Sequence, residues 1–232
     1  MKPARRGKEG LTALVAGASG LVGGEVLARL VRSDAYTRVI VLTRRDLGAL
    51  AEQPRVRQVI TGFDRLDTVL DQLGADHVFC ALGTTIRKAG SQARFREVDH
   101  DYPVRLATLA LAQGARHFSV VSALGASRRS TFFYSRVKGE MEEALRGMKW
   151  PSLAIFRPSV IAGERAESRP LERLGEHLLR LAPATWRPVA ASDIATAMVA
   201  VAIEAPPGLT VVESSQIPAR ARAAAATSTA SR

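Results

Sequence analysis

The chain has 232 residues, of which 47% are hydrophobic and 24% are charged, and its formal net charge is +11. This length and composition predict an ordinary globular protein with one sizeable core and one principal domain. The positive charge indicates attraction to anions, but aromatic residues make up only 5% of the chain and no basic block is interleaved with them, so we expect no specific nucleic-acid site.

Residues 11–31 form an apolar stretch whose hydropathy is similar to that of a signal peptide or a membrane span. The stretch contains four glycines together with Glu25 and Arg29, and these residues exclude both assignments. We therefore expect a cytoplasmic protein with no membrane span. The basic residues within 1–10 predict a flexible leader ahead of the first strand.

The first predicted strand, residues 11–16, runs into a glycine-rich turn at residues 17–23 and then into a helix. Glycine lacks a Cβ, so such a turn can lie against a ligand, while the helix aims free N–H groups and its positive dipole end at an anion. A dinucleotide pyrophosphate is the usual ligand, although a G-x-x-G-x-x-G turn can also be purely structural. The residues expected to contact a cofactor here are Gly17, Ser19, Gly20, Leu21, Val22 and Gly23.

Short apolar runs alternate with amphipathic segments along the rest of the chain. The predicted strands are residues 11–16, 38–43, 56–61, 77–82, 117–122, 152–157 and 209–213, and the predicted helices are residues 21–31, 66–73, 92–112, 133–146, 171–181 and 192–203. Strands that alternate with helices predict a parallel sheet covered on both faces. We therefore expect a doubly wound α/β fold, in which ligands bind at the carboxyl ends of the strands.

The end of the second predicted strand reads Thr43-Arg44-Arg45. Many NAD-binding folds place an acidic residue there to bind the adenosine ribose, whereas guanidinium groups suit the 2′-phosphate of NADP. Arg44 and Arg45 therefore favour NADP(H) over NAD(H). The alternative is that one or both of these arginines simply point into solvent. Asp64 follows the third strand, where it can meet the adenine edge or act as an ordinary helix N-cap.

Tyr134 and Lys138 are four residues apart in a predicted helix, so both point to one face. Ser122 ends a predicted strand twelve residues earlier, at the edge where a cofactor is expected. Hydride transfer to a carbonyl needs a proton at oxygen, and a neighbouring ammonium favours the phenolate form of a tyrosine. These residues predict that Tyr134 is a general acid or base, that Lys138 tunes it and holds the nicotinamide ribose, and that Ser122 hydrogen-bonds the substrate oxygen. The alternative is an amphipathic helix with its lysine in water.

Cys80 is the single cysteine, and it stands inside an apolar run. We expect a reduced thiol in the core rather than a nucleophile. The four histidines show no metal-ligand spacing, so we predict no metal site.

Several of these features occur together in one known superfamily. The glycines at 17, 20 and 23, Ser122, the Tyr134–Lys138 pair and Arg157-Pro158 together resemble the short-chain dehydrogenase/reductase superfamily, with the glycine spacing of its extended and atypical branches. A closer similarity, to the small branch that includes the mammalian HIV-Tat-interacting-protein oxidoreductase, rests on residues 81–85, 88–90, 98–102, 137–140 and 167–170. The similarity runs from about residue 11 to residue 188.

This resemblance implies an NADPH-binding Rossmann fold. It also implies that Gly83 and Thr84 approach the cofactor and that Pro158 and Val160 flank the nicotinamide. Asp99 stands where many members have an asparagine that supports a proton relay, so the relay is expected to differ or to be absent.

We expect residues 11–214 to form the Rossmann domain, with a very small substrate region at about 159–190 and a disordered tail at 215–232. The expected function is hydride transfer between NADP(H) and a carbonyl or alcohol substrate. An NADPH-binding regulator with vestigial catalysis is the first alternative, and a nucleotide-sugar epimerase or dehydratase is the second. A homodimer or a protein partner stays open.

Overall fold

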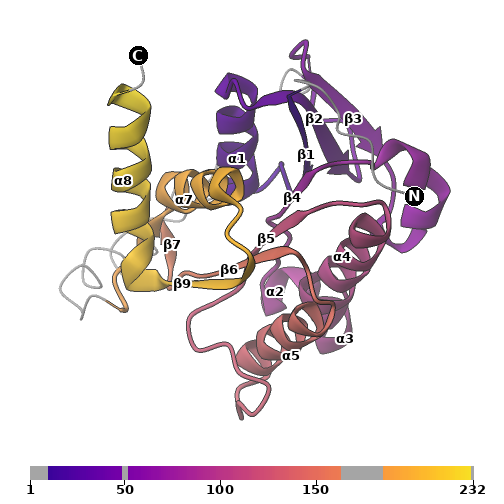
Figure 1. Cartoon of the computed structure of the whole chain (residues 1–232). Coiled ribbons are helices and arrows are strands. Elements are labelled where there is room, and N and C mark those ends of the chain that lie inside the picture. The colour runs from indigo at the N-terminus through magenta and orange to yellow at the C-terminus, as the bar shows by residue number, and fades with distance from the viewer. Residues whose placement is uncertain (1–9, 49–51, 163–184, 231–232) are drawn as a thin grey trace.

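The computed structural model describes residues 10–48, 52–162 and 185–230 (Figure 1). The expected helix at 171–181, most of the expected substrate region and nearly all of the basic leader lie outside the described residues.

Seven parallel strands form one sheet in the order β3-β2-β1-β4-β5-β6-β9. The strands are β1 Leu11–Ala16, β2 Tyr36–Thr43, β3 Val56–Ile60, β4 His77–Cys80, β5 His117–Val121, β6 Ser152–Arg157 and β9 Gly208–Glu213. All seven expected strands are present, and the doubly wound Rossmann fold is confirmed. A separate two-stranded pair, β7 (Ile161–Ala162) with β8 (Val189–Ala190), was not expected, because two-residue strands carry no readable alternation.

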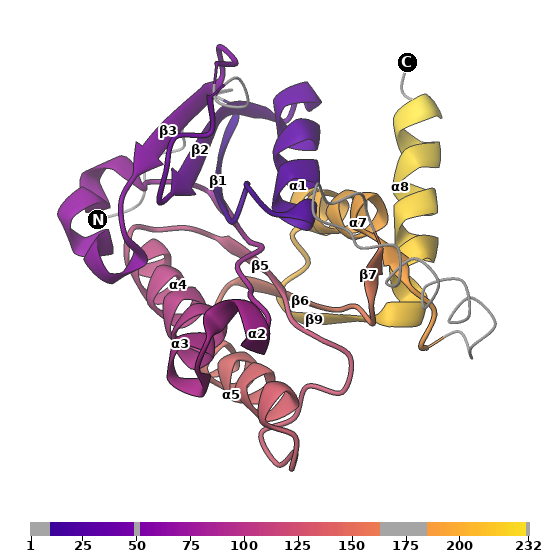
Figure 2. The ribbon, with the colours of Figure 1, turned by 180° about the vertical axis from the view of Figure 1, so that it is seen from behind.

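Helices cover both faces of the sheet. The regular helices are α1 Leu21–Arg32, α2 Ile86–Ala89, α3 Gln92–Arg96, α4 Tyr102–Ala112, α5 Phe133–Gly147, α7 Ala191–Glu204 and α8 Ile217–Ala230. Helices α1 and α7 lie against one face, and α4 and α5 against the other (Figures 1 and 2).

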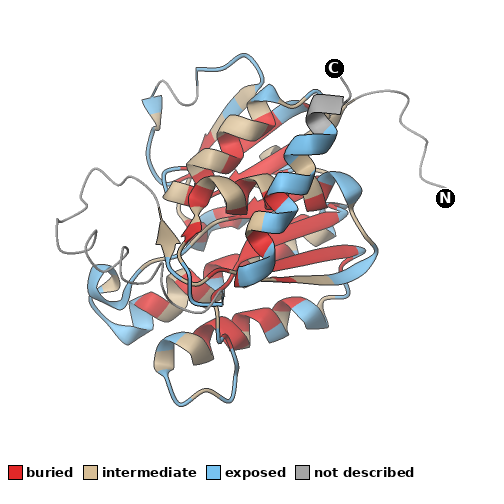
Figure 3. Cartoon of the chain, turned by 90° about the vertical axis from the view of Figure 1, so that its left-hand side faces the viewer, coloured by how far each residue is buried: buried red, intermediate tan, exposed pale blue. Residues whose placement is uncertain are grey.

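Side-chain alternation along the buried strands supplies both layers of the core. In β1, Ala13 and Val15 pack toward α1 and α7, whereas Leu14 and Ala16 pack toward α4 and α5. Apolar residues on both faces of a strand read as a continuous apolar run, which is the pattern of a parallel sheet buried on both sides. Figure 3 shows this buried layer between helices whose outer faces are exposed.

The predicted helix at 66–73 is instead the 3-10 helix η2 (Phe63–Gln72), which has non-helical dihedral angles at Arg65 and Val69. Its apolar residues Phe63, Leu66 and Val69 pack on the core at spacings of three. That period matches the three residues per turn of a 3-10 helix. The spacing of the apolar residues therefore explains why this segment is a 3-10 helix and not the predicted α-helix.

The predicted single helix at 92–112 is divided into α3, the π-helical turn η3 (Glu97–Asp101) and α4. Pro103 is the second residue of α4, separated from the π turn by Tyr102 alone. A proline ring clashes with the carbonyl four residues earlier in a regular α-helix, and a widened turn relieves that clash.

The expectation of a disordered tail at 215–232 is wrong. The short 3-10 helix η4 (Ser214–Gln216) leads into α8, in which Ile217 and Ala221 are buried at helical spacing. Helix α8 packs along α7 (Figure 1). Alanine has the highest intrinsic helix propensity, so an alanine-rich segment needs only a few packing contacts to stay helical.

Candidate active site

Two adjoining cavities lie at the carboxyl edge of the sheet. Both are lined by Ala81, Leu82 and Gly83, which follow β4. The first cavity extends to the glycine turn and the end of β2, and the second extends to the end of β5 and the start of α5. Together they form one elongated site at the place where doubly wound sheets bind their ligands.

The glycine turn forms the wall of the first cavity. Gly17 has a φ of +91° and a Cβ built there would lie 2.6 Å from the carbonyl oxygen of Ala81, so a side chain has no room. A Cβ on Gly23 would lie 2.1 Å from the carbonyl oxygen of Gly17. Because both positions require glycine, the turn folds tightly onto α1 and leaves the amino end of that helix facing the cavity. These residues fit a dinucleotide pyrophosphate.

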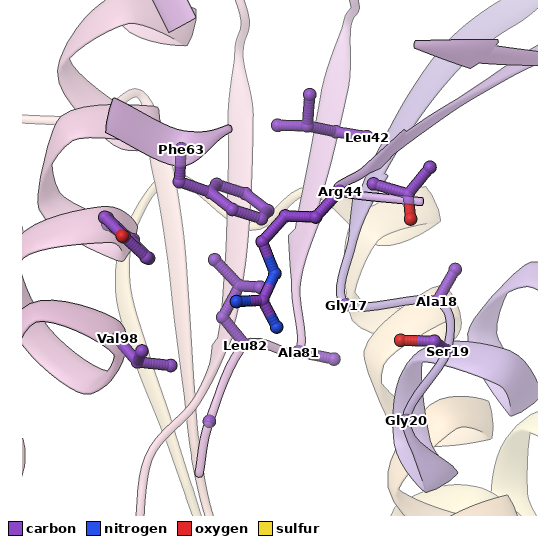
Figure 4. Close-up of a pocket in the computed structure, with 13 residues that line it drawn as sticks. Gly17, Ala18, Ser19, Gly20, Leu42, Arg44, Phe63, Ala81, Leu82 and Val98 are labelled. Carbon is purple, nitrogen blue, oxygen red and sulfur yellow. The ribbon is translucent and has the colours of Figure 1, made fainter. Parts of the chain in front are cut away.

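Arg44 points into the first cavity from the end of β2 (Figure 4). Phe63 lines the same cavity, and the glycine turn lies on the opposite side of it. The neighbouring Arg45 and Asp64 are exposed and line neither cavity. The structure therefore brings one of the two arginines to the site and offers Phe63 at the position expected for the adenine contact.

Tyr134 and Lys138 both line the second cavity from one face of α5. The Tyr134 ring packs on the buried ring of Phe95, with 5.5 Å between the ring centroids. The Tyr134 side chain still exposes part of its surface, because the residue is 39% accessible. The phenol is thus held at one side by an aromatic neighbour and is open to a ligand.

Lys138 is buried, and its Nζ lies 2.8 Å from Oδ1 of Asp99 in η3. The same ammonium lies 3.4 Å from the carbonyl oxygen of Val121. Burial by itself lowers the pKa of Lys138, but the Asp99 carboxylate, with smaller contributions from Tyr134 and Cys80, outweighs burial and raises that pKa. The lysine is therefore held as a charged group beside the tyrosine.

Ser122 also lines the second cavity, but its hydroxyl donates to Glu142 at 2.6 Å. Glu142 is 2% exposed and also receives two hydrogen bonds from the Arg157 guanidinium, at 2.9 and 2.6 Å. In this arrangement the Ser122 proton is directed to a buried carboxylate and not to the cavity. Glu142 was missed, although it continues the four-residue spacing of Tyr134 and Lys138.

The sequence-predicted site residues fall into two groups. Those that line the two cavities are Gly17, Ser19, Gly20, Leu21, Val22, Arg44, Gly83, Thr84, Ser122, Tyr134, Lys138 and Val160. Those that line neither are Gly23, Arg45, Asp64 and Pro158, of which Gly23 supports the turn and Pro158 is buried. The lining residues that the sequence did not indicate include Thr43, Phe63, Tyr102 and Ser159.

Cys80 is fully buried in β4, and burial raises the pKa of its thiol to about 11. The side chain is a core thiol, as expected. Within residues 10–48, 52–162 and 185–230, no group of three or more histidine, cysteine or acidic residues is arranged to hold a metal ion. No helix in the same ranges has the length and apolar character needed to span a membrane.

Several known proteins are similar to this chain in sequence. Protein HTATIP2 of Rattus norvegicus is 38% identical over 174 residues, which cover 74% of this chain and 72% of that protein. A fungal protein, fmp52, mitochondrial, of Emericella nidulans, is 35% identical over 161 residues, covering 67% of this chain and 69% of that protein.

Solved structures share the fold at low sequence identity. The Bordetella bronchiseptica enzyme WbmG in complex with NAD aligns with a TM-score of 0.68 at 13% identity, covering 95% of this chain and 79% of that one. The UDP-glucose 4-epimerase of Thermotoga maritima aligns with a TM-score of 0.66 at 16% identity, covering 88% and 77%. Residues 13–147, from β1 through α5, match the NAD dependent epimerase/dehydratase family. With that match over more than half of its length, the chain belongs to the NAD-dependent epimerase/dehydratase family of extended short-chain dehydrogenases/reductases.

Proposed function

We propose that the protein is an NADP(H)-linked oxidoreductase that interconverts a carbonyl and an alcohol. The observation that carries the proposal is the convergence of Tyr134 and a charged Lys138 on a cavity that continues into the glycine turn. A phenol beside a buried ammonium is equipped to move a proton at a substrate oxygen.

The residues around the two cavities fit a nicotinamide dinucleotide. The amide groups of the glycine turn at the start of α1 would hold the pyrophosphate, and Gly83 and Thr84 would line the path toward the second cavity. Lys138 would hold the ribose next to the nicotinamide, with Val160 against the ring. When bound, the cofactor supplies or accepts the hydride.

Arg44 supports a preference for NADP(H). Its guanidinium lies in the first cavity at the end of β2, where a carboxylate would repel a 2′-phosphate. A guanidinium can instead bind that phosphate with charge-assisted hydrogen bonds. NADPH and NADH titrations followed by cofactor fluorescence test this preference, and tighter binding of NADH would contradict it.

The protein's own contribution to the chemistry is proton transfer and positioning. Tyr134 would give a proton to the carbonyl oxygen in reduction and take it back in oxidation, while Lys138 stabilises the phenolate between the two steps. Ser122 was expected to bind the same oxygen, but its hydroxyl is directed to Glu142. We therefore assign the oxygen contact to Tyr134.

A panel of aldehydes and ketones, assayed for NADPH oxidation, tests the proposal. Tyr134→Phe should lower kcat by roughly 100- to 10,000-fold, because it removes the transferred proton and leaves the ring. Tyr36→Phe is a matched control, since it removes a phenol hydroxyl at the opposite edge of the sheet. If no substrate is turned over and NADPH instead changes binding to another protein, the regulatory alternative replaces this proposal.

The cellular compartment is part of the same proposal. We propose a cytoplasmic protein, from the composition of residues 11–31. The fungal relatives carry the word mitochondrial in their names, so fractionation of cells that express the full chain provides the test.

A further inference from the structure

The loop that follows β6, residues 158–160, forms one wall of the second cavity. Ser159 and Val160 line that cavity, and the proposed function puts Val160 against the nicotinamide ring. The loop belongs to no helix or strand, so its backbone groups must find their hydrogen-bond partners in other segments. The contacts that hold this loop therefore determine the shape of the cavity wall.

The backbone of the loop is held from three directions. The carbonyl oxygen of Pro158 accepts a hydrogen bond of 2.8 Å from the loop after β5, and the carbonyl oxygen of Val160 accepts one of 2.9 Å from the first residue of β8. Between them, the N–H of Ser159 donates to Oγ of Ser214 at 3.1 Å. Of these three contacts, the one to Ser214 alone uses a side chain, so a substitution can remove it without a change in the backbone.

Ser214 lies on a segment that is itself anchored on both sides. It is 1% exposed and begins η4, the turn between β9 and α8. Before it, Glu213 pairs with Arg157 at 2.9 Å and forms a capping box with Gln216. After it, Ile217 at the start of α8 is fully buried. The end of β9 thus brings a fixed hydroxyl to the β6 loop, close to β7 (Figures 1 and 2).

We propose that Ser214 is a positioning residue of the cofactor site, whose buried hydroxyl holds the backbone of Ser159 and keeps the wall at residues 158–160 in the shape that accepts the nicotinamide. This inference rests on the proposed function for the identity of the ligand. It gives the segment after β9, which the sequence led us to expect as disordered, a part in the site. A wall that is ordered before binding removes the entropic cost of ordering it on binding.

The test compares two ligands by isothermal titration calorimetry and requires no substrate. NADPH would extend through both cavities, whereas adenosine 2′,5′-bisphosphate lacks the nicotinamide and would occupy the first cavity only. Ser214→Ala removes the acceptor for the N–H of Ser159. We expect NADPH affinity to fall by about threefold to tenfold, as for the loss of one hydrogen bond, and the affinity for the bisphosphate to change by less than about twofold. If the wild type prefers NADH, then NADH with ADP is the corresponding pair.

Ser152→Ala is the matched control. Ser152 is also a buried serine with a hydrogen-bonded hydroxyl, but it lies at the amino end of β6, where it contacts His117. This variant should unfold at lower urea concentration and leave the ratio of the two affinities unchanged. Ser214→Cys repeats the comparison if Ser214→Ala does not fold, since a thiol is a weaker acceptor of similar size.

A folded Ser214→Ala variant that loses affinity for both ligands by the same factor, or for neither, would overturn the inference, because a serine that only supports the fold cannot distinguish the two ligands. The two proposals can fail separately. A selective loss of NADPH affinity in a protein that turns over no carbonyl supports the inference and contradicts only the proposed reaction. An active enzyme whose affinity ratio is unchanged by Ser214→Ala contradicts the role of Ser214.

Discussion

The two edges of the sheet bury different kinds of polar group. At the amino-terminal edge, Tyr36, His77 and His117 are buried as neutral, hydrogen-bonded side chains. At the carboxyl edge, Lys138 and Asp99 are buried as an ion pair beside a cavity. Tyr36 contacts His77 at 2.9 Å, and His117 contacts Ser152 and Ser119 at 2.8 and 2.7 Å. The side chains at the amino edge therefore satisfy one another.

The carboxyl edge leaves polar groups available to a ligand. Tyr134 is partly exposed there, and the amino end of α1 faces the cavity. The difference indicates that the two edges serve stability and binding respectively. Changes at the amino edge should alter the free energy of unfolding with little effect on cofactor affinity, and a change of the cavity-lining side chain of Arg44 should do the reverse.

Gly23→Ala should give the largest effect of any single substitution in the glycine turn. The added Cβ would lie 2.1 Å from the carbonyl oxygen of Gly17, which is backbone and cannot rotate away. We expect the turn to be displaced, with NADPH affinity weakened by about 100-fold or more and stability lowered by about 3 kcal/mol. Isothermal titration calorimetry and urea unfolding measure the two quantities.

Gly147→Ala is the matched control for that change. It lies near the end of α5, and a Cβ built there meets nothing within 4 Å. Alanine should stabilise that helix slightly, by up to about 1 kcal/mol, and leave NADPH affinity unchanged. If Gly23→Ala binds NADPH as the wild type does, the glycine turn does not contact the cofactor.

Acid should destabilise the protein through the amino edge. Burial lowers the pKa of His77 to about 4, and burial together with the charge of His77 lowers the pKa of His117 to about 3. In the unfolded chain both histidines bind protons near pH 6.5, so between about pH 6.5 and 4 the unfolded state holds more protons. Stability is therefore fully present above pH 6.5 and falls as the pH drops, by about 3 kcal/mol for His77 alone.

Urea unfolding at several pH values between 7.5 and 4.5 measures this loss. A double variant, His77→Gln with His117→Gln, should lose stability at pH 7.5 but show a flatter dependence on pH. NADPH affinity of the folded fraction should stay unchanged, because neither histidine lines the site cavities. An equally steep pH dependence in the double variant would mean that other groups cause the acid sensitivity.

Arg44 and Arg45 provide a comparison within the carboxyl edge. Arg44 lines the first cavity and Arg45 does not, although the two are adjacent in sequence. Arg44→Ala should weaken NADPH binding by roughly 10- to 100-fold, as expected for the loss of hydrogen bonds to a charged phosphate, and leave NADH binding nearly unchanged. Arg45→Ala should change either affinity by less than about threefold. Equal losses in the two variants would show that Arg44 makes no specific contact.

The sequence predicted the strands well because each is a short apolar run buried on both faces, and that pattern is local. It also placed Tyr134, Lys138 and Arg44 at the correct edge, since parallel strands bring their carboxyl ends together. The Lys138–Asp99 ion pair could not be predicted from the sequence, because the contact joins different helices and depends on a π turn. Helix α8 was missed because its periodicity is weak and its stability comes from alanine propensity and from packing on α7.

Of the substitutions considered, Ser122→Ala should change stability and activity least. It separates two roles for Ser122, support of a buried hydrogen-bond network and contact with the substrate oxygen. In the structure the hydroxyl donates to Glu142, which also binds Arg157, so the serine belongs to a buried network between α5 and β6. Loss of one of several hydrogen bonds to Glu142 should cost about 1 kcal/mol of stability and change kcat/KM by less than about threefold.

Glu142→Gln is the matched variant, since it weakens the same network from the other side and should also act mainly on stability. The alternative is that Ser122 rotates toward the substrate during turnover. Removal of a donor to a developing oxyanion would lower kcat by roughly 100- to 1000-fold while leaving the unfolding free energy almost unchanged. The ratio of the two losses in Ser122→Ala thus decides whether this serine at the carboxyl edge supports the fold or takes part in the reaction.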